Sequence, residues 1–167
     1  QELAQAITLY EQGTYREALD GTDAVPGLLT IVDEYGGTQA GNLAHFYAAD
    51  ALFRLGEYDQ ALELFDAFDK SNNIVGASAY AGMASIYELR EEYERAGDYY
   101  LRAAEQFDSD QTAPQYLLDA GAAYEEAGAY RAALDVYETI RDDYAESSAA
   151  SDIDFFIARV QAKQRSS

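Results

Sequence analysis

The 167-residue chain has no cysteine and no tryptophan, and it has one methionine, one histidine and two prolines. Without cysteine, neither a disulfide nor a thiolate metal site can form. His45 alone is too little for a zinc site or a histidine-based catalytic triad. No apolar run reaches the ~18 residues of a membrane-spanning helix. We therefore expect no catalysis, no cofactor and no metal, and we expect His45 to be a packed residue.

Basic residues are also scarce, since 31 acidic residues stand against 11 basic ones and the formal net charge is −20. Such a surface repels nucleic acid and anionic lipid, which both bind through Lys and Arg. The acidity is spread along the chain, and Lys70 and Lys163 are the only lysines. This pattern suits a protein that stays soluble in high salt. We expect a halophilic source, with an ordinary acidic bacterial protein as the alternative.

The chain does contain a recurring spacing within long stretches rich in Ala, Leu, Tyr and Glu, which favour helix. The pattern Tyr-x-x-Ala begins at Tyr15, Tyr58, Tyr93 and Tyr130, so the intervals are 43, 35 and 37 residues. A period near 34 in a helical chain is typical of a helix-turn-helix repeat array.

A longer pattern surrounds this spacing in three of the repeats. A large residue is followed by small or apolar residues three and four positions later and by a large one at seven. An Ala then follows at sixteen and an aromatic at twenty. Small residues allow the helices to approach closely, and aromatics fill the seam between hairpins. The positions are His45, Ala48, Ala49, Leu52, Ala61 and Phe65; Tyr80, Met83, Ala84, Tyr87, Ala96 and Tyr100; and Leu117, Ala120, Gly121, Tyr124, Ala133 and Tyr137.

The turn inside each hairpin is marked by a glycine two residues before the Tyr, at Gly13, Gly56 and Gly128. A glycine there can adopt a positive φ and end the first helix. The third repeat has Glu91 in that place. Its turn requires either a small strain or a different geometry.

The 43-residue interval indicates an insertion that splits the second helix of the first repeat. Residues 20–27 are rich in Gly and Asp and contain Pro26, so helix should stop there. Helix should resume over residues 28–35 and end at Gly36-Gly37, with Thr38 as the N-cap of the next helix.

The tail, residues 148–165, is expected to be a capping helix that covers the last apolar face of the array. Its apolar residues recur at helical spacing, while Arg159 and Lys163 lie outside that stripe. Ser148 or Ser151 is the expected N-cap. The stripe consists of Ile153, Phe156, Ile157 and Val160.

With four such units, the chain resembles tetratricopeptide-repeat (TPR) proteins over residues 1–147. The resemblance implies one all-α domain, a right-handed superhelix of antiparallel helix pairs with a C-terminal capping helix. The expected repeats are residues 1–37, which is degenerate, 40–72, 76–108 and 112–147.

Residues 28–65, LLTIVDEYGGTQAGNLAHFYAADALFRLGEYDQALELF, are similar to those of membrane-anchored bacterial TPR proteins akin to YfgM. That narrower resemblance implies a periplasmic domain that assists the secretory translocon and envelope chaperones. It also implies an N-terminal anchor upstream of Gln1, with a cytoplasmic location as the alternative.

In a TPR array, the first helices of the hairpins line a concave groove. Its N-terminal half is predicted to be apolar and aromatic, and its C-terminal half small and acidic. The candidate groove residues are Leu3, Ile7, Tyr10, Phe46, Asp50, Phe53, Ala81, Ser85, Glu88, Leu118, Ala122 and Glu125. Because Lys, Arg and Asn are missing there, a clamp for a peptide carboxylate is disfavoured, and an apolar or basic segment is the expected ligand. Alternatively, the 28–35 helix or a partner chain fills the groove.

Other candidate sites have simpler explanations. The run 108–112 begins like a calcium loop but lacks the required Gly and distal Glu, so Asp110 or Thr112 is expected to cap a helix that carries Pro114 in its first turn. Paired acidic residues such as Glu125-Glu126 diverge by about 100° on a helix and are expected to be solvated. The predicted function is therefore a protein-binding scaffold, with a self-associating structural module that forms a homo-oligomer as the alternative.

The acidic composition generates a test. If the surface is adapted to high salt, the unfolding temperature of the chain should rise as KCl increases from low to molar concentration, because screening relieves like-charge repulsion. Thermal unfolding followed by circular dichroism measures this, and a flat response would contradict a halophilic origin.

Overall fold

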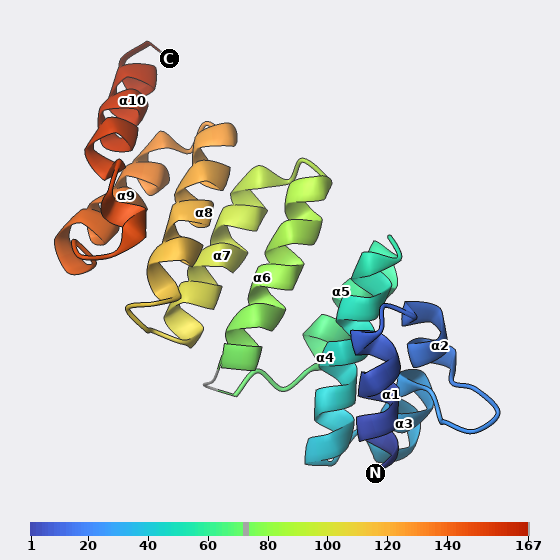
Figure 1. Cartoon of the computed structure of the whole chain (residues 1–167). Helices are drawn as coiled ribbons and strands as arrows, with labels where there is room; N and C mark the ends of the chain where they lie inside the picture. The colour runs from blue at the N-terminus through green and yellow to red at the C-terminus, as the bar shows by residue number, and fades with distance from the viewer. Residues whose placement is uncertain (72–73, 167) are drawn as a thin grey trace. The chain divides into compact units, whose positions relative to one another are not determined.

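The computed structural model describes residues 1–71 and 74–166. Within that part of the chain it contains ten α-helices, one short 3-10 helix and no β-strand (Figure 1). The chain divides into two compact units, unit 1 (Gln1–Lys70) and unit 2 (Ser71–Ser167). The predicted all-α fold of antiparallel helix pairs with a C-terminal capping helix is confirmed. The predicted end of the second repeat, residue 72, lies outside the described residues.

Unit 1 contains two helix hairpins and one extra helix. Its helices are α1 (Glu2–Glu11), α2 (Tyr15–Asp20), α3 (Leu28–Tyr35), α4 (Gln39–Arg54) and α5 (Tyr58–Ala67). The α1–α2 and α4–α5 pairs are the hairpins, and α3 packs mainly against α4. The core is built from alanines that let the helices approach closely and from a few large side chains. Its fully buried large residues are Leu19, Leu28, Leu52 and Phe65.

The insertion in the first repeat has the predicted architecture. Helix α2 stops at Asp20, and the loop that follows closes on itself through a bridge between Gly21 and Pro26. Helix α3 then occupies the predicted residues 28–35. The Thr38 hydroxyl accepts a hydrogen bond of 3.0 Å from the amide of Gly41 and so caps α4, as predicted.

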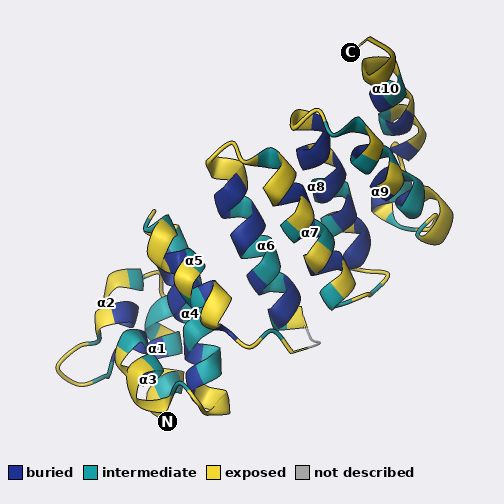
Figure 2. Ribbon diagram, turned by 180° about the vertical axis from the view of Figure 1, so that it is seen from behind, coloured by how far each residue is buried: buried dark blue, intermediate teal, exposed yellow. Residues whose placement is uncertain are grey.

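Unit 2 is a stack of helices in chain order (Figures 1 and 2). They are α6 (Ile74–Leu89), α7 (Tyr93–Gln106), α8 (Ala113–Glu126), α9 (Tyr130–Asp143), the 3-10 helix η1 (Ser148–Ala150) and α10 (Ile153–Ser166). The predicted seam is confirmed, because Leu117, Tyr124 and Tyr137 are all buried. Gly121 lies so close to Tyr137 that an added Cβ would come within 2.2 Å of the ring. The small residues of the pattern therefore make room for the aromatics of the next helix.

The hairpin turns share one geometry. Gly13, Gly56 and Gly128 have φ of 80°, 81° and 73°, as predicted. Glu91 adopts the same left-handed conformation with φ 61°, so the third turn keeps its geometry and accepts the strain.

One predicted helix start and one predicted side-chain cap are wrong. Helix α10 begins at Ile153 rather than at 148, and the amides of Phe155 and Phe156 bond to the Asp152 carbonyl, so neither Ser148 nor Ser151 is its N-cap. Residues 148–150 instead form the separate 3-10 helix η1, in which Ala149 is buried. Helix α8 does follow Thr112 with Pro114 in its first turn, but the helical backbone at Thr112 turns its hydroxyl away from the amides it would cap, and that hydroxyl is buried without a hydrogen bond.

The strained turn generates a prediction. The substitution Glu91→Gly should raise the free energy of unfolding by about 0.5–1 kcal/mol, because the relief of the left-handed strain exceeds the entropy cost of glycine. Gly128→Ala, in the equivalent turn, should lower it by a similar amount. Urea unfolding of both variants measures the effect, and a loss of stability in Glu91→Gly would show that the Glu91 side chain outweighs its backbone.

Candidate functional site

The predicted groove residues of unit 1 are all partly exposed on α1 and α4. The structure brings Tyr10 and Asp50 together, since the Tyr10 hydroxyl donates to the Asp50 carboxylate. Arg54 pairs with the same carboxylate at 2.5 Å and lies over the ring of Tyr10. Burial and then the Asp50 carboxylate raise the pKa of Tyr10 to about 12. Asp50 is therefore engaged within the chain rather than presented as a free acidic group.

The aromatic side chains of α4 are also engaged within unit 1. Phe46 contacts the rings of Phe65 and Phe68 at centroid distances of 6.0 and 5.8 Å. Phe53 packs on Tyr58 at 5.7 Å. These tilted and edge-on contacts fasten α4 to α5. The aromatic half of the predicted groove is thus mainly a packing surface with exposed edges.

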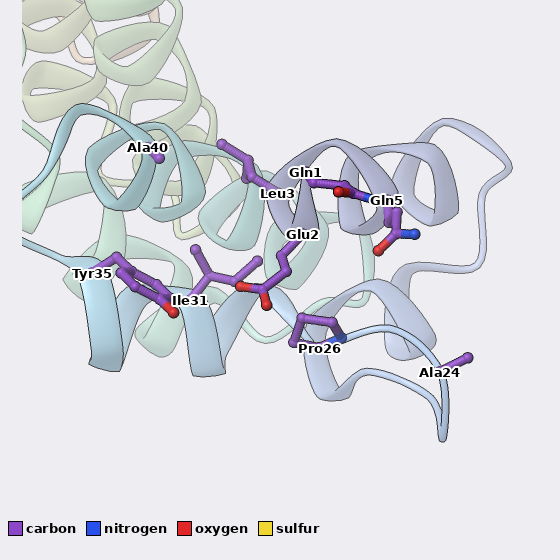
Figure 3. A pocket seen from close by; sticks show the side chains of 9 residues that line it. All are labelled: Gln1, Glu2, Leu3, Gln5, Ala24, Pro26, Ile31, Tyr35 and Ala40. Carbon is purple, nitrogen blue, oxygen red and sulfur yellow. The ribbon is translucent and has the colours of Figure 1, made fainter.

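Unit 1 contains an open cleft beside Leu3, with a volume of about 580 Å³ (Figure 3). Its wall is formed by Ile31 and Tyr35 of α3, with Pro26 from the inserted loop and Ala40 at the start of α4. Ile31 is 2% exposed and Tyr35 is 42% exposed. Helix α3 therefore lines a cleft next to Leu3 and leaves it open.

The rim of this cleft is acidic. Figure 3 shows the Glu2 side chain reaching from α1 toward Pro26 and Ile31. The charges of Glu2 and then Glu34 raise the pKa of the Tyr35 hydroxyl, which reports a negative potential at this edge. An apolar wall with a negative rim suits an apolar segment that carries a positive charge.

In unit 2, the predicted groove residues Ser85 and Glu88 of α6 meet Tyr100 of α7. The Tyr100 hydroxyl donates to the Glu88 carboxylate at 3.0 Å and lies 3.2 Å from the Ser85 hydroxyl. Burial and the Glu88 charge raise the pKa of Tyr100 to about 12. Glu88 and Ala122 are exposed, and the other predicted positions, Ala81 and Leu118, are partly exposed.

Glu125 corrects the sequence analysis, which placed it on an exposed, solvated face of the groove. Its side chain is 5% exposed because α10 lies over it. Arg159 Nη2 donates to one carboxylate oxygen at 2.6 Å, and Lys163 Nζ lies 2.8 Å from the other. Burial disfavours the charge of Glu125, but the two cations outweigh it and lower its pKa. We call these three side chains the cap triad.

Aromatic contacts extend the cap triad to α9. The guanidinium of Arg159 lies 4.9 Å from the ring centre of Phe156, and that ring packs on Tyr137 at 5.7 Å. A partly exposed cation over an aromatic ring contributes about 0.5–1 kcal/mol. Helices α8, α9 and α10 are therefore joined by one polar and aromatic cluster. The sequence analysis missed this cluster, and the one available signal was the pair Arg159 and Lys163, spaced by four residues in an otherwise acidic chain.

The remaining candidates have structural roles. His45 is partly buried, with Nδ1 2.9 Å from the Gly41 carbonyl oxygen of its own helix. Asp108, in the run examined as a calcium loop, accepts a hydrogen bond of 2.5 Å from Tyr144. In the part of the chain that the structure describes, no group of three or more acidic or histidine side chains is placed to hold a metal ion. None of the described helices is both long and apolar enough to cross a membrane.

The cap triad generates a prediction with a pH dependence. Glu125→Gln should lower the free energy of unfolding by about 1–2 kcal/mol at pH 7. This is less than the loss expected when a fully buried ion pair is broken, because both cations are partly exposed. The folded pKa lies below the ordinary value of 4.5, so the contribution is full above that value and disappears as pH falls through the folded pKa.

Urea unfolding at several pH values, with hydrogen exchange of the α10 amides, measures this difference. Glu126→Gln is the control, because it removes the same charge from an exposed neighbour. Equal stability of the two variants at pH 7 would show that the cap triad does not hold α10.

Comparisons with known proteins find the same repeat architecture. A family model described as tetratricopeptide repeat matches residues 43–71 and 115–147. The first segment begins in α4 and the second begins in α8. The fold is similar to a crystal structure of nearly identical TPR-like repeats from Podosopora anserina, assigned to a kinesin light chain. That likeness has a TM-score of 0.66 and 13% identity, and it covers 99% of this chain and 85% of that one. No curated protein matches the chain in sequence. Two segments of the chain therefore match the tetratricopeptide repeat, and its fold is that of TPR-like repeats. TPR repeats generally mediate protein–protein interaction.

Proposed function

We propose that this chain is a non-catalytic protein-binding module and that the cleft beside Leu3 docks an apolar polypeptide segment that carries a positive charge. The observation that supports this most directly is the origin of the cleft. One side of it comes from residues 20–37, the insertion that departs from the plain repeat, from which Pro26, Ile31 and Tyr35 line it. A repeat of the usual two helices packs without an added helix such as α3.

The chemistry of the cleft favours this kind of ligand. Tyr35 is an exposed aromatic beside buried Ile31, and such a ring at the edge of an apolar pocket is a common anchor for a partner. Glu2 and Glu34 place negative charge on the same edge. A segment with apolar side chains and a Lys or Arg would bury its apolar part and pair its charge.

We further propose that the module works on the periplasmic side of the bacterial envelope, beside the translocon or envelope chaperones. The support for this is the resemblance of residues 28–65 and the split helix within it, where α3 ends and Thr38 caps α4. Unfolded chains handled by such machinery expose apolar segments, which match the apolar wall of the cleft.

A direct test uses a displayed library of random 12-residue peptides selected on the whole chain. Selected peptides should be enriched in apolar and basic residues. Tyr35→Ser should weaken their binding about tenfold, because it removes an aromatic anchor, and Glu2→Gln should weaken binding less and reduce its dependence on salt. Isothermal titration calorimetry measures both.

The matched control is Leu55→Ser. Leu55 is an apolar residue of unit 1 with 39% exposure, close to the 42% of Tyr35, and it follows α4 at the end opposite Ala40. Binding that is unchanged in Tyr35→Ser, or lost equally in Leu55→Ser, would contradict the cleft as the docking site. Light scattering that shows an oligomer dissociated by Tyr35→Ser would instead favour the self-associating module.

A further inference from the structure

We infer that the exposed face of α10 is a self-association surface, on which α10 of a second copy of this chain packs in the antiparallel orientation. Helix α10 is buried on one side and exposed on the other (Figure 2). The exposed face carries Phe155, Ala158 and Ala162, with Asp154 and Arg165 on its flank. This surface is separate from the cleft of unit 1, and the inference does not depend on the function proposed for that cleft.

The centre of the face is a large apolar side chain that the fold leaves uncovered. Phe155 is 62% exposed, the highest value among the large apolar side chains that the structure describes. Ala158 and Ala162 follow it by three and seven residues, so they share its side of the helix, and both are exposed. A helix that only solvated the end of a repeat array would present polar residues here.

The charges of α10 are ordered so that two copies complement each other. Arg165 follows Asp154 by eleven residues, which is close to three helical turns, so both side chains lie on one flank of the helix. When a twofold axis relates two antiparallel helices, this flank meets the same flank of the second copy. Asp154 of each copy then faces Arg165 of the other. A parallel pair would instead place like charges together, which disfavours it.

One register satisfies the apolar contact and the charge pairs together. With the twofold axis beside residues 158–160, Phe155 lies opposite Ala162 of the second copy, whose small side chain leaves room for the ring. Arg159 comes near its own counterpart at this axis, but its charge is already paired with Glu125 at 2.6 Å. The order of acid and base also suits the dipole of a single helix. The dipole does not account for the exposed phenylalanine between them.

Helix α10 is also a place where two copies of this acidic chain can meet with little repulsion. Three basic residues and one acidic residue lie within Ile153–Ser166, whereas the whole chain has a net charge of −20. At physiological ionic strength the Debye length is about 8 Å, so distant carboxylates of the two copies are screened while facing side chains still interact. A pair of 14-residue helices buries less than the ~1,600 Å² of a standard interface, so the expected dimer is weak and depends on concentration.

Sedimentation equilibrium of the whole chain, from about 5 to 500 μM in about 0.15 M KCl, measures this association. Phe155→Ala should raise the dissociation constant of the dimer at least about tenfold, because it removes the aromatic anchor while alanine keeps the helix favourable. Leu89→Ala is the matched control. It removes a similarly exposed apolar side chain, 58% exposed, from the end of α6, and it should leave the dissociation constant unchanged.

Charge reversal tests the orientation of the two helices. Asp154→Arg and Arg165→Asp should each raise the dissociation constant about fivefold, because each creates two like-charge contacts. An equimolar mixture of the two variants should associate as the unmodified chain does, since every contact then joins an Arg to an Asp. The double variant should do the same. Both side chains are exposed, and thermal unfolding followed by circular dichroism checks that each variant is folded.

A chain that stays monomeric at the highest concentration, or association that is unchanged in Phe155→Ala, would overturn the inference. A mixture of the two charge variants that stays dissociated would also overturn it, because opposite charges would then not face each other. A dimer that Tyr35→Ser dissociates and Phe155→Ala does not would place the contact on unit 1 instead. Peptides that fail to bind the cleft of unit 1 would contradict the proposed function and leave the α10 dimer standing.

Discussion

A helix stack of this kind depends on one constraint, which is that every apolar face must be covered by the next helix. The alternation of small and aromatic residues satisfies it inside the array, as Gly121 against Tyr137 shows. After α9, the helix α10 takes the place of the next repeat's first helix, with Ile153, Ile157 and Val160 buried. The cap triad adds charge pairing to this apolar contact, so the position of α10 is specified by polar geometry as well as by burial.

The regular part of the fold could be predicted because it depends on local chemistry. A glycine needed for a positive φ, a Gly-Asp-rich break and a threonine N-cap act within a few residues, so Gly56, residues 20–27 and Thr38 were all correctly predicted. For the third turn, the sequence left two alternatives, a strained turn with the glycine geometry or a different geometry. Glu91 keeps the glycine geometry because the helices on either side fix the turn more strongly than one residue's preference resists it.

The parts that sequence reasoning missed depend on contacts between distant residues. Glu125 looks like any exposed acidic residue until Arg159, 34 residues later, lies over it. The Thr112 hydroxyl has the right position for a cap but the wrong backbone conformation. The cleft of unit 1 combines α1 with the insertion, and only the placement of α3 shows that Leu3 faces an open space. Periodicity identifies which residues are buried by their own repeat, but not which surface residues a later helix will cover.

The scarcity of basic residues links the fold to the choice of partner. Ion pairs among the described residues include Arg16 with Glu57, Arg54 with Asp50, Arg95 with Glu92, Arg141 with Asp142, and Arg159 and Lys163 with Glu125. Arg16, Arg159 and Lys163 join different elements of the fold in this way, and the other three pairs lie within or next to one helix. The excess carboxylates that remain, with a net charge of −20, have too few cations of their own. Under the function proposed here, a docking surface of this chain would favour a partner that brings positive charge, because such a partner pairs the carboxylates that it desolvates.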